Sequence, residues 1–314
     1  MSEENIYFKF DGKTYGGKKG DTIASALLRN EVKLISRSFK YHRPRGIYTC
    51  GIEEPNALVQ IINEHNEPNV RATVKQIYDG MIIKSQNRWP SLKRDFGSIN
   101  NLLSPIFSAG FYYKTFMGPK SFWKNVYEPL IRRTAGLGKP PREFKSKSIH
   151  LHHNVDVLIV GGGLAGLLAA KKLAGTDQDV LLIERDNNLG GILKNSNKIK
   201  SIDDQKSANW VEKTEWLLKS ANNIKILKNT TVTTYNYKDH LIAIEDKSVG
   251  APPDNSKPEL VMHKIRTKHT ILANGHIERF LSFRNNDLPG VMLAASFEKY
   301  IHRYGVVADT SPVI

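Results

Sequence analysis

The residues of this sequence whose types and spacing most clearly indicate a binding site are three glycines and one acid. Gly161, Gly163 and Gly166 stand in the spacing G-x-G-x-x-G, and Glu184 follows 18 residues after the last of them. A glycine turn of this kind presents main-chain N–H groups to a pyrophosphate, and an acid at this distance accepts hydrogen bonds from the hydroxyl groups of a ribose. The pattern therefore predicts a site for an adenine dinucleotide.

The elements around these residues are those that such a site needs. An apolar strand over 155–160 precedes the glycines, a helix over 167–174 follows them, and a second apolar strand ends at Glu184. The first glycine is expected to allow the tight turn, the second the close approach of the pyrophosphate, and the third the close packing of helix on strand. The whole is the order of a βαβ unit.

Three neighbouring residues bear on which dinucleotide is bound. Arg185 leaves a 2′-phosphate open as a ligand, but the adjacent Glu184 favours a free ribose hydroxyl and so disfavours NADP. Gly191 extends the glycine pattern, and Gly275 follows a further apolar strand over 269–273. In register with the first motif, Gly275 is expected to let the backbone pass near the coenzyme.

Length and composition bound the class of protein. With 314 residues, of which 40% are hydrophobic, the chain has room for about two domains. Its one cysteine, Cys50, excludes disulfides, cysteine-rich zinc sites and redox dithiols. No apolar run reaches the ~18 residues of a membrane span. Because the N-terminus shows no leader pattern, we expect a cytoplasmic protein with no membrane partner.

The net charge of +15 lies mostly in the first half of the chain. Residues 1–150 hold 25 Lys and Arg against 13 Asp and Glu, whereas the remainder holds 21 against 18. A basic half indicates nucleic acid, an acidic partner subunit or only a lysine-rich proteome. Because the basic residues are scattered among Trp, Phe and Pro, we expect no nucleic-acid partner.

The opening residues predict a β-grasp domain, the fold of ubiquitin-like proteins and of plant-type [2Fe–2S] ferredoxins. Strands over 6–10 and 14–15 lead to a helix over 23–29, capped by Asp21-Thr22, and a strand follows over 57–62. A [2Fe–2S] centre takes four thiolates, or two thiolates and two histidines. The single cysteine cannot hold one.

Residues 86–153 are predicted to form an aromatic-rich connecting segment. Aromatic residues among glycines and prolines suit either a substrate channel or an anchor against a neighbouring domain or subunit, and we favour the anchor. His150, His152 and His153 lie just before the apolar strand. A metal site is one reading of them, but a strand would splay the three side chains, so we expect solvated histidines and no metal.

The fold class predicted is α/β with an α+β N-terminal part. It comprises a cluster-free β-grasp domain over 1–85, the connecting segment over 86–153, and a flavoprotein-type Rossmann-like dinucleotide domain over 154–314 that is incomplete at its C-terminus. After the βαβ unit of the last part we expect a further helix and five further strands: a helix over 205–221 opened by Asp203-Asp204, and strands over 224–227, 231–235, 241–245, 260–266 and 269–273.

The chain closely resembles, over essentially its whole length, the α subunits of heterotetrameric sarcosine oxidases, and five segments make the resemblance specific. These segments are RSFKYHRPRGIYTCGIEEPNALV (37–59), PNVRAT (68–73), SQNRWPSL (85–92), AGFYYKTFM (109–117) and YEPLIR (127–132). They lie outside the glycine motif, which flavoproteins in general share, and this makes the resemblance specific.

The resemblance implies one subunit of an αβγδ enzyme that oxidatively demethylates sarcosine to glycine. Oxygen is the acceptor, hydrogen peroxide is formed, and the one-carbon unit leaves as formaldehyde or, with tetrahydrofolate, as methylene-tetrahydrofolate. In such enzymes the β subunit carries FAD and the amine-oxidising site, FMN lies at the α/β interface, and the α subunit binds NAD. The implied NAD-binding residues are Gly161, Gly163, Gly166, Glu184 and Gly191, with backbone contacts from Leu164, Ala165, Val232 and Gly275.

The sequence departs from the family pattern in three ways. Leu164 stands where the glycine loop usually has proline, and Asn274 stands where a threonine is usual. The chain is also about a third as long as the family's α subunits, without their folate-binding C-terminal half, so we expect a truncated or split α subunit. We expect no catalytic residue on it. The alternatives are an FAD-binding α subunit of a related amine or proline dehydrogenase, and a non-catalytic scaffold.

Overall fold

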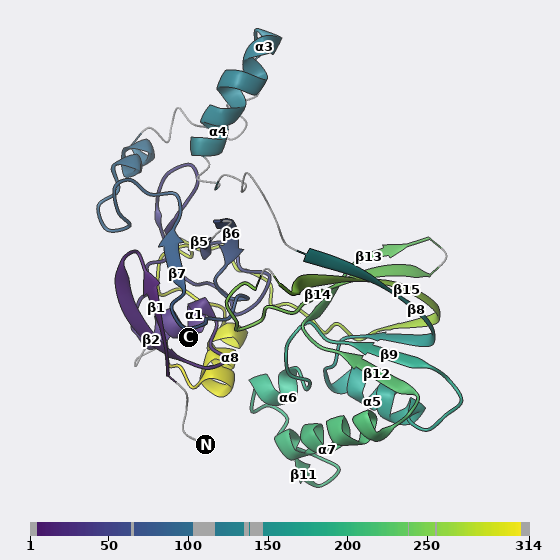
Figure 1. Ribbon diagram of the computed structural model, residues 1–314. Coiled ribbons are helices and arrows are strands. Elements are labelled where there is room, and N and C mark those ends of the chain that lie inside the picture. The colour runs from purple at the N-terminus through teal and green to yellow at the C-terminus, as the bar shows by residue number, and fades with distance from the viewer. Residues whose placement is uncertain are drawn as a thin grey trace. The chain divides into compact units, whose positions relative to one another are not determined.

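Two compact units make up the chain, and neither is continuous in sequence (Figure 1). The computed structural model describes residues 5–63, 66–102, 117–134, 138, 147–237, 239–254 and 256–308. The first unit contains the described residues within Met1–Phe144, Arg279–Tyr300 and Val306–Ile314. The second contains those within Lys145–Glu278 and Ile301–Gly305. The three segments expected from the sequence stay a prediction as a division into domains.

The first unit is built on a five-stranded sheet with the order β2-β1-β7-β5-β6. In β1, exposed and buried residues alternate, so Ile6, Phe8 and Phe10 point into the core. The turn between the first two strands has positive φ at Asp11 and Gly12, as a tight hairpin requires. The strands are β1 (Asn5–Phe10), β2 (Lys13–Lys18), β5 (Leu58–Ile62), β6 (Glu67–Arg71) and β7 (Ile82–Ser85).

Helix α1 (Ile23–Arg29) covers this sheet and begins where the sequence predicts. Its N-cap is Thr22, whose side chain accepts a hydrogen bond from Ser25 N–H, while the Ser25 hydroxyl accepts from Thr22 N–H. The remaining elements are β3 (Ser36–Arg37), β4 (Pro44–Arg45), the 3-10 helix η1 (Phe96–Asn101), α3 (Lys120–Phe122), the π-helix η2 (Trp123–Tyr127), α4 (Glu128–Thr134) and α8 (Ala294–Tyr304). The last residues of α8, from Ile301 on, belong to the second unit.

The second unit is built on a six-stranded sheet with the order β12-β9-β8-β15-β14-β13. Its strands are β8 (Lys147–Val160), β9 (Val180–Ile183), β12 (Ile224–Leu227), β13 (Thr230–Asn236), β14 (His240–Asp246) and β15 (Pro258–Leu272). Strands β8, β9 and β12 pair in parallel, and β13, β14 and β15 form an antiparallel meander. The other elements are α5 (Leu164–Leu173), α6 (Ile192–Asn195), the hairpin β10 (Ser201–Ile202) and β11 (Gln205–Lys206), and α7 (Ser207–Ser220).

Two apolar cores hold the second unit together, one on each face of the parallel strands. On one face, Val157 and Ile159 pack with residues of α5 and α7, and Trp210 is almost fully buried there. On the other face, Leu158 and Leu181 pack with apolar residues of the meander. Alternate residues of β8 therefore serve opposite cores, and both cores hold the carboxyl ends of β8 and β9 in place.

Two expectations for the second unit are wrong in detail. The strands expected over 260–266 and 269–273 are a single strand, β15, which pairs antiparallel with β14 and parallel with β8. The long helix starts at Ser207 rather than at residue 205, and Lys206 is its N-cap, without a side-chain cap. Asp203 and Asp204 both have positive φ in the turn of the β10–β11 hairpin, so they shape a turn and do not open the helix.

Much of the aromatic connecting segment falls outside the described residues, which omit 103–116, 135–137 and 139–146. Whether this segment anchors the chain or lines a channel stays a prediction. Among the helices of the described residues, none has both the length and the apolar character that crossing a membrane requires.

Candidate dinucleotide-binding site

The glycine turn lies between the end of β8 and the start of α5, and two of its glycines are there for steric reasons. Gly161 has a φ of +106°, and a Cβ built on it would lie 2.4 Å from the carbonyl oxygen of Ala273. A Cβ on Gly166 would lie 1.8 Å from the carbonyl oxygen of Gly161. The turn and the helix therefore pack against each other at main-chain distance, as the motif predicts.

Gly163 differs from these two glycines because its surroundings are open. It is the N-cap of α5, with φ −76° and ψ −170°, and no side chain caps the helix there. A Cβ on this residue would find no atom within 4 Å. The first helical residues are Leu164, which packs on the core, and Ala165, which is exposed. An uncapped helix N-terminus facing open space fits a pyrophosphate.

Glu184 follows the end of β9 and is tied to the same turn. Its Oε2 accepts a hydrogen bond from Gly162 N–H at 2.7 Å, and its Oε1 accepts one from Asp186 N–H at 2.8 Å. A carboxylate offers about four acceptor positions. The half-buried Glu184 thus keeps acceptor capacity on each oxygen, which suits the two hydroxyl groups of a ribose.

Gly190 and Gly191 lie against the glycine turn and contact Gly162 and Gly163. Gly190 N–H donates to the carbonyl of Gly162 at 2.8 Å, so Gly162 is held by Glu184 on one side and by Gly190 on the other. Gly191 has a φ of +50°, and a Cβ on it would lie 3.1 Å from the Cα of Gly163. Gly191 therefore borders the open space beside Gly163.

Arg185 does not turn toward the carboxylate that would hold the ribose. Its Nε lies 3.9 Å from Asp186 Oδ1, and Asp186 also forms an ion pair with Arg303. The choice between a free 2′-hydroxyl and a 2′-phosphate on the ribose stays a prediction.

The structure places the two remaining predicted contacts on neighbouring elements. Val232, on β13, packs against the core beneath β9, and Thr230 on the same strand donates its N–H to the carbonyl of Glu184 at 2.9 Å. Gly275 follows β15 two residues after Ala273, with a φ of +72° and open space around it. The contact of Val232, Gly275 and the other predicted residues with a coenzyme stays a prediction.

The three histidines before the glycine turn have different surroundings. His150 and His152 are exposed, as expected, whereas the expectation of a solvated side chain is wrong for His153. Its Nε2 lies 2.9 Å from Nδ1 of the buried His263, on β15. In turn, His263 Nε2 lies 3.0 Å from Glu245 Oε2, on β14. Among the described residues, no group of three or more His, Cys, Asp or Glu is placed to hold a metal ion.

This histidine pair predicts a loss of stability in mild acid. Burial lowers the pKa of His153 below its usual 6.5, and the charges of Lys225, His263 and His152 lower it further. The unfolded chain then binds more protons than the folded one below pH 6.5, so stability falls as the pH drops from there through the folded pKa. We expect the free energy of unfolding, measured in urea, to fall less between pH 7.5 and 5.5 for His153→Gln than for the wild type. The control His150→Gln should show the wild-type dependence of this free energy on pH. The same dependence on pH in all three proteins would refute the prediction.

The ferredoxin-like loop of the first unit has a carboxylate at its centre. Glu54 Oε2 accepts hydrogen bonds from Tyr48 N–H (3.0 Å), Thr49 N–H (2.7 Å) and the Thr49 hydroxyl (3.2 Å). Its Oε1 accepts from Asn56 N–H (2.7 Å) and Ala57 N–H (3.0 Å). Burial raises the pKa of Glu54, and the four backbone N–H donors oppose that rise.

This loop does not fit an iron–sulfur cluster. The sequence holds one cysteine, Cys50, which is buried, and a [2Fe–2S] centre needs at least two thiolates. The main-chain N–H groups that turn inward are taken by Glu54 instead. Glu54 could not be found from the sequence, because an acid in an irregular loop carries no periodic signal of burial.

Two protein-family models match the chain. The model described as "2Fe-2S iron-sulfur cluster binding domain" matches residues 3–88, and the model described as "Pyridine nucleotide-disulphide oxidoreductase" matches residues 155–310. By fold and site, the chain thus joins a ferredoxin-like domain to a dinucleotide-binding domain of oxidoreductase type, and the predicted fold class is confirmed. The second model implies a flavin or a nicotinamide dinucleotide as cofactor.

The particular relatives are α subunits of sarcosine oxidase. The chain is 42% identical over 317 residues to "Sarcosine oxidase subunit alpha" of Rhizobium meliloti (strain 1021), and 30% identical over 318 residues to that of Corynebacterium sp. (strain P-1). These alignments cover 98% and 99% of this chain but 31% and 28% of the relatives, so the chain spans about a third of their length. The resemblance found in the sequence is confirmed.

One solved structure is similar over nearly the whole chain. The L-proline dehydrogenase from P. horikoshii matches 98% of this chain and 48% of its own, with a TM-score of 0.62 and 21% sequence identity. At this identity the match supports the fold alone.

Proposed function

We propose that the chain is the nucleotide-binding part of an amine-oxidising oxidoreductase of the sarcosine oxidase type. The complete enzyme would convert sarcosine, oxygen and water to glycine, formaldehyde and hydrogen peroxide, or pass the one-carbon unit to tetrahydrofolate. In this proposal the chain holds NAD and docks a flavin-bearing β subunit within an assembly that also has γ and δ subunits. The proposal is supported by the relatives' names together with the uncapped glycine turn beside Glu184.

In this proposal each residue at the turn has a binding role and none is catalytic. The N–H groups at the start of α5 meet the pyrophosphate above Gly163, and Glu184 accepts from the ribose hydroxyls. Gly191 and Gly275 keep the sides of the site free of side chains. In this proposal the chain holds NAD without using it as a redox partner. FMN at the α/β interface of the complete enzyme belongs to the same proposal. FAD in place of NAD is its alternative, and an experiment separates the two.

The observation that most directly supports NAD binding is the open space at Gly163. The coenzyme content of the purified chain tests the proposal. Denaturation followed by chromatography should release about one NAD for each chain, or calorimetry should show the apo chain binding NAD. Yellow colour near 450 nm with released FAD would instead support the FAD-binding alternative. A colourless chain that neither releases nor binds a dinucleotide would refute the proposal and leave a non-catalytic scaffold.

A single methyl group added at Gly163 is expected to weaken NAD binding without unfolding the chain. Gly163→Ala should weaken NAD binding by tenfold or more, because the added Cβ would occupy space that the pyrophosphate needs. The stability of the chain should change by no more than about 1 kcal/mol, since the residue has a negative φ and its Cβ meets no atom. Calorimetric titration and urea unfolding of both proteins measure the two effects. Unchanged NAD affinity would place the coenzyme elsewhere.

A further inference from the structure

An exposed row of apolar side chains stands on the first unit, outside the nucleotide site. Phe96, Ile99 and Leu102 follow one another at intervals of three along the 3-10 helix η1 and its C-cap. Because a 3-10 helix has three residues per turn, side chains at this interval lie on one face. Their exposed fractions are 63%, 62% and 79%. The Trp89 ring, 68% exposed, lies 5.2 Å from that of Phe96, centroid to centroid, and we call these four residues the aromatic ridge.

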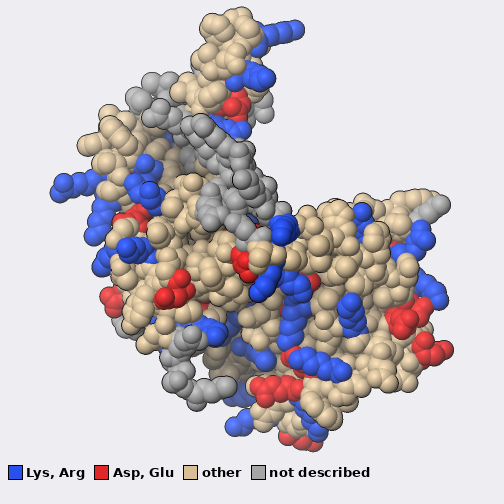
Figure 2. Space-filling view, viewed as in Figure 1, with Lys and Arg blue, Asp and Glu red and all other residues tan. Residues whose placement is uncertain are grey.

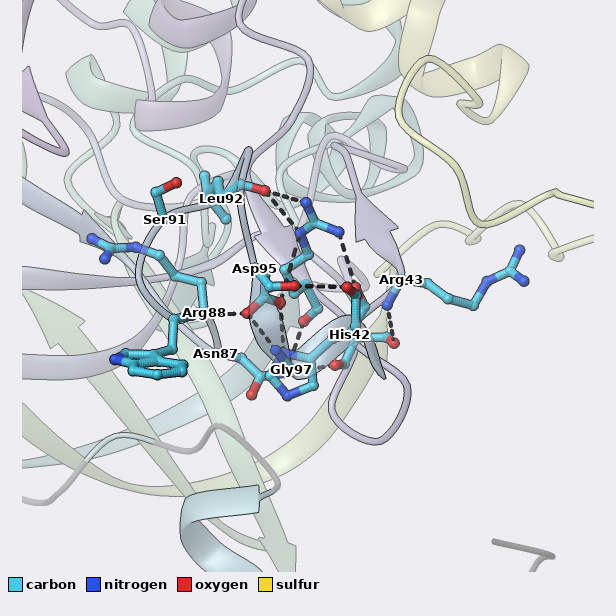
Figure 3. A network of polar contacts seen from close by, with 12 residues as sticks. His42, Arg43, Asn87, Arg88, Ser91, Leu92, Asp95 and Gly97 are labelled. Carbon is cyan, nitrogen blue, oxygen red and sulfur yellow. Dashed lines mark hydrogen bonds and ion pairs between the residues drawn. The ribbon is translucent and has the colours of Figure 1, made fainter. Parts of the chain in front are cut away.

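The main chain beneath the ridge is fixed by one buried carboxylate (Figure 3). Asp95 Oδ1 accepts hydrogen bonds from Trp89 N–H at 2.9 Å and from Gly97 N–H at 3.2 Å. Its Oδ2 lies 2.6 Å from His42 Nδ1 and 3.9 Å from Arg37 Nε. Phe96 N–H also donates to the carbonyl of Trp89 at 2.7 Å. The two aromatic residues of the ridge are thus attached to one rigid loop.

Two further contacts hold this loop on the domain. Arg37 Nε donates to the carbonyl of Leu92 at 2.9 Å, and its Nη1 donates to the carbonyl of His42 at 3.1 Å. The imidazole of His42 packs directly on Gly97, where a Cβ would lie 2.3 Å from the ring. A loop whose main chain is already fixed loses little conformational entropy on binding a partner, and Trp is among the residues that dominate interface energetics.

The charge around the ridge is positive. Lys93 and Arg94 are exposed between Trp89 and Phe96, whereas Asp95 is buried and already faces His42 and Arg37. Basic side chains are spread over the face shown in Figure 2, and the whole chain carries a net charge of +15. A second copy would bring like charges together. Half of the ridge is aliphatic, which suits a protein pocket better than the stacking of bases.

We propose that the aromatic ridge is the surface by which the first unit docks the β subunit, which on this view offers an apolar pocket edged by carboxylates. The inference rests on the proposed function, which makes the chain one component of a multi-subunit enzyme. Trp89 and Phe96 are the anchors that enter the pocket, and Lys93 and Arg94 meet its acidic edge. Asp95 is a positioning residue that acts through the loop.

The test is binding of the purified chain to the β subunit encoded in the same genome. We expect Trp89→Ser to weaken this binding by tenfold or more in calorimetry, about 1.4 kcal/mol. Trp216→Ser is the matched control, because Trp216 is 71% exposed on α7 of the second unit, and it should bind as the wild type does. Lys93→Glu with Arg94→Glu should slow association, and this effect should shrink in 1 M salt.

The outcomes separate this inference from the proposed function. Wild-type affinity of Trp89→Ser for the β subunit would overturn the ridge as the docking surface and leave the nucleotide site untouched. A chain that binds NAD but no β subunit would do the same. A lower unfolding temperature for Trp89→Ser would assign the ridge to a covering segment of this chain. Self-association, or RNA binding, that Trp89→Ser abolishes would assign it to a second copy or to nucleic acid. NAD content should stay equal in all variants.

Discussion

Gly166→Ala is expected to unfold the second unit, at a cost on the order of 3 kcal/mol or more. The added Cβ would lie 1.8 Å from the carbonyl oxygen of Gly161 and 3.0 Å from its carbonyl carbon. These atoms cannot move aside, because Gly161 N–H donates to the carbonyl of Ile183 at 2.8 Å and its Cα faces Ala273. Relief of the clash requires α5 to leave the sheet, which would open the core around Leu167.

Hydrogen exchange resolved by peptide is the measurement, since it reports on each unit separately. Amides of β8 and α5 should lose protection in Gly166→Ala, whereas those of β1 and α1 should keep it. Gly163→Ala is the control, because it adds the same methyl group three residues earlier and meets no atom. Wild-type protection of β8 in Gly166→Ala would show that the helix does not pack on the turn as described.

The elements that could be predicted from the sequence are those specified by local chemistry. The first hairpin follows from Asp11-Gly12, and α1 follows from Thr22 and the six buried residues after it. The βαβ unit with its glycine spacing could be recognised because Gly161 and Gly166 meet short-range steric demands, while Gly163 leaves the start of the helix open. Turn chemistry and periodicity are readable without knowledge of the fold.

What was missed depends on contacts between residues far apart in the chain. Strand β7 was not among the strands expected from the sequence, and it forms because it pairs with both β1 and β5. The expected break in β15 reflects the polar Thr267-Lys268, but parallel pairing with β8 carries the strand through it. Asp203-Asp204 has the composition of a helix cap and serves instead as a hairpin turn. Tertiary pairing overrides local propensity in each case.

The same distinction applies to the polar centres. Glu184 was singled out because the motif fixes its distance from the glycines, whereas its bond to Gly162 was not foreseen. Asp95 and Glu54 gave no sequence signal, since their partners are backbone N–H groups of loops whose shape only the fold determines. The pairing of His153 with His263 spans 110 residues and likewise escapes a local reading.

Glu54→Ala is expected to destabilise the first unit by about 3 to 5 kcal/mol, although Glu54 lies far in sequence from the glycine turn. The substitution removes the acceptor of five hydrogen bonds at once, and their donors stay in a loop whose residues 46–51 and 57 are buried or nearly so. Glu54→Gln should restore little of the stability lost in Glu54→Ala. Its amide N–H₂ group would face N–H donors, and only its oxygen could accept hydrogen bonds.

Hydrogen exchange over residues 46–57 and thermal unfolding measure this effect, with Glu53→Ala as the control for loss of a neighbouring acid that takes no part in these five bonds. Because the carboxylate and not a cluster collects these N–H groups, an iron chelator should leave the wild-type unfolding temperature unchanged. A chelator-sensitive transition, or an unfolding temperature of Glu54→Ala equal to that of the wild type, would mean that another group organises the loop. These measurements therefore test whether the Glu54 carboxylate organises the loop of the ferredoxin-like domain in place of a cluster.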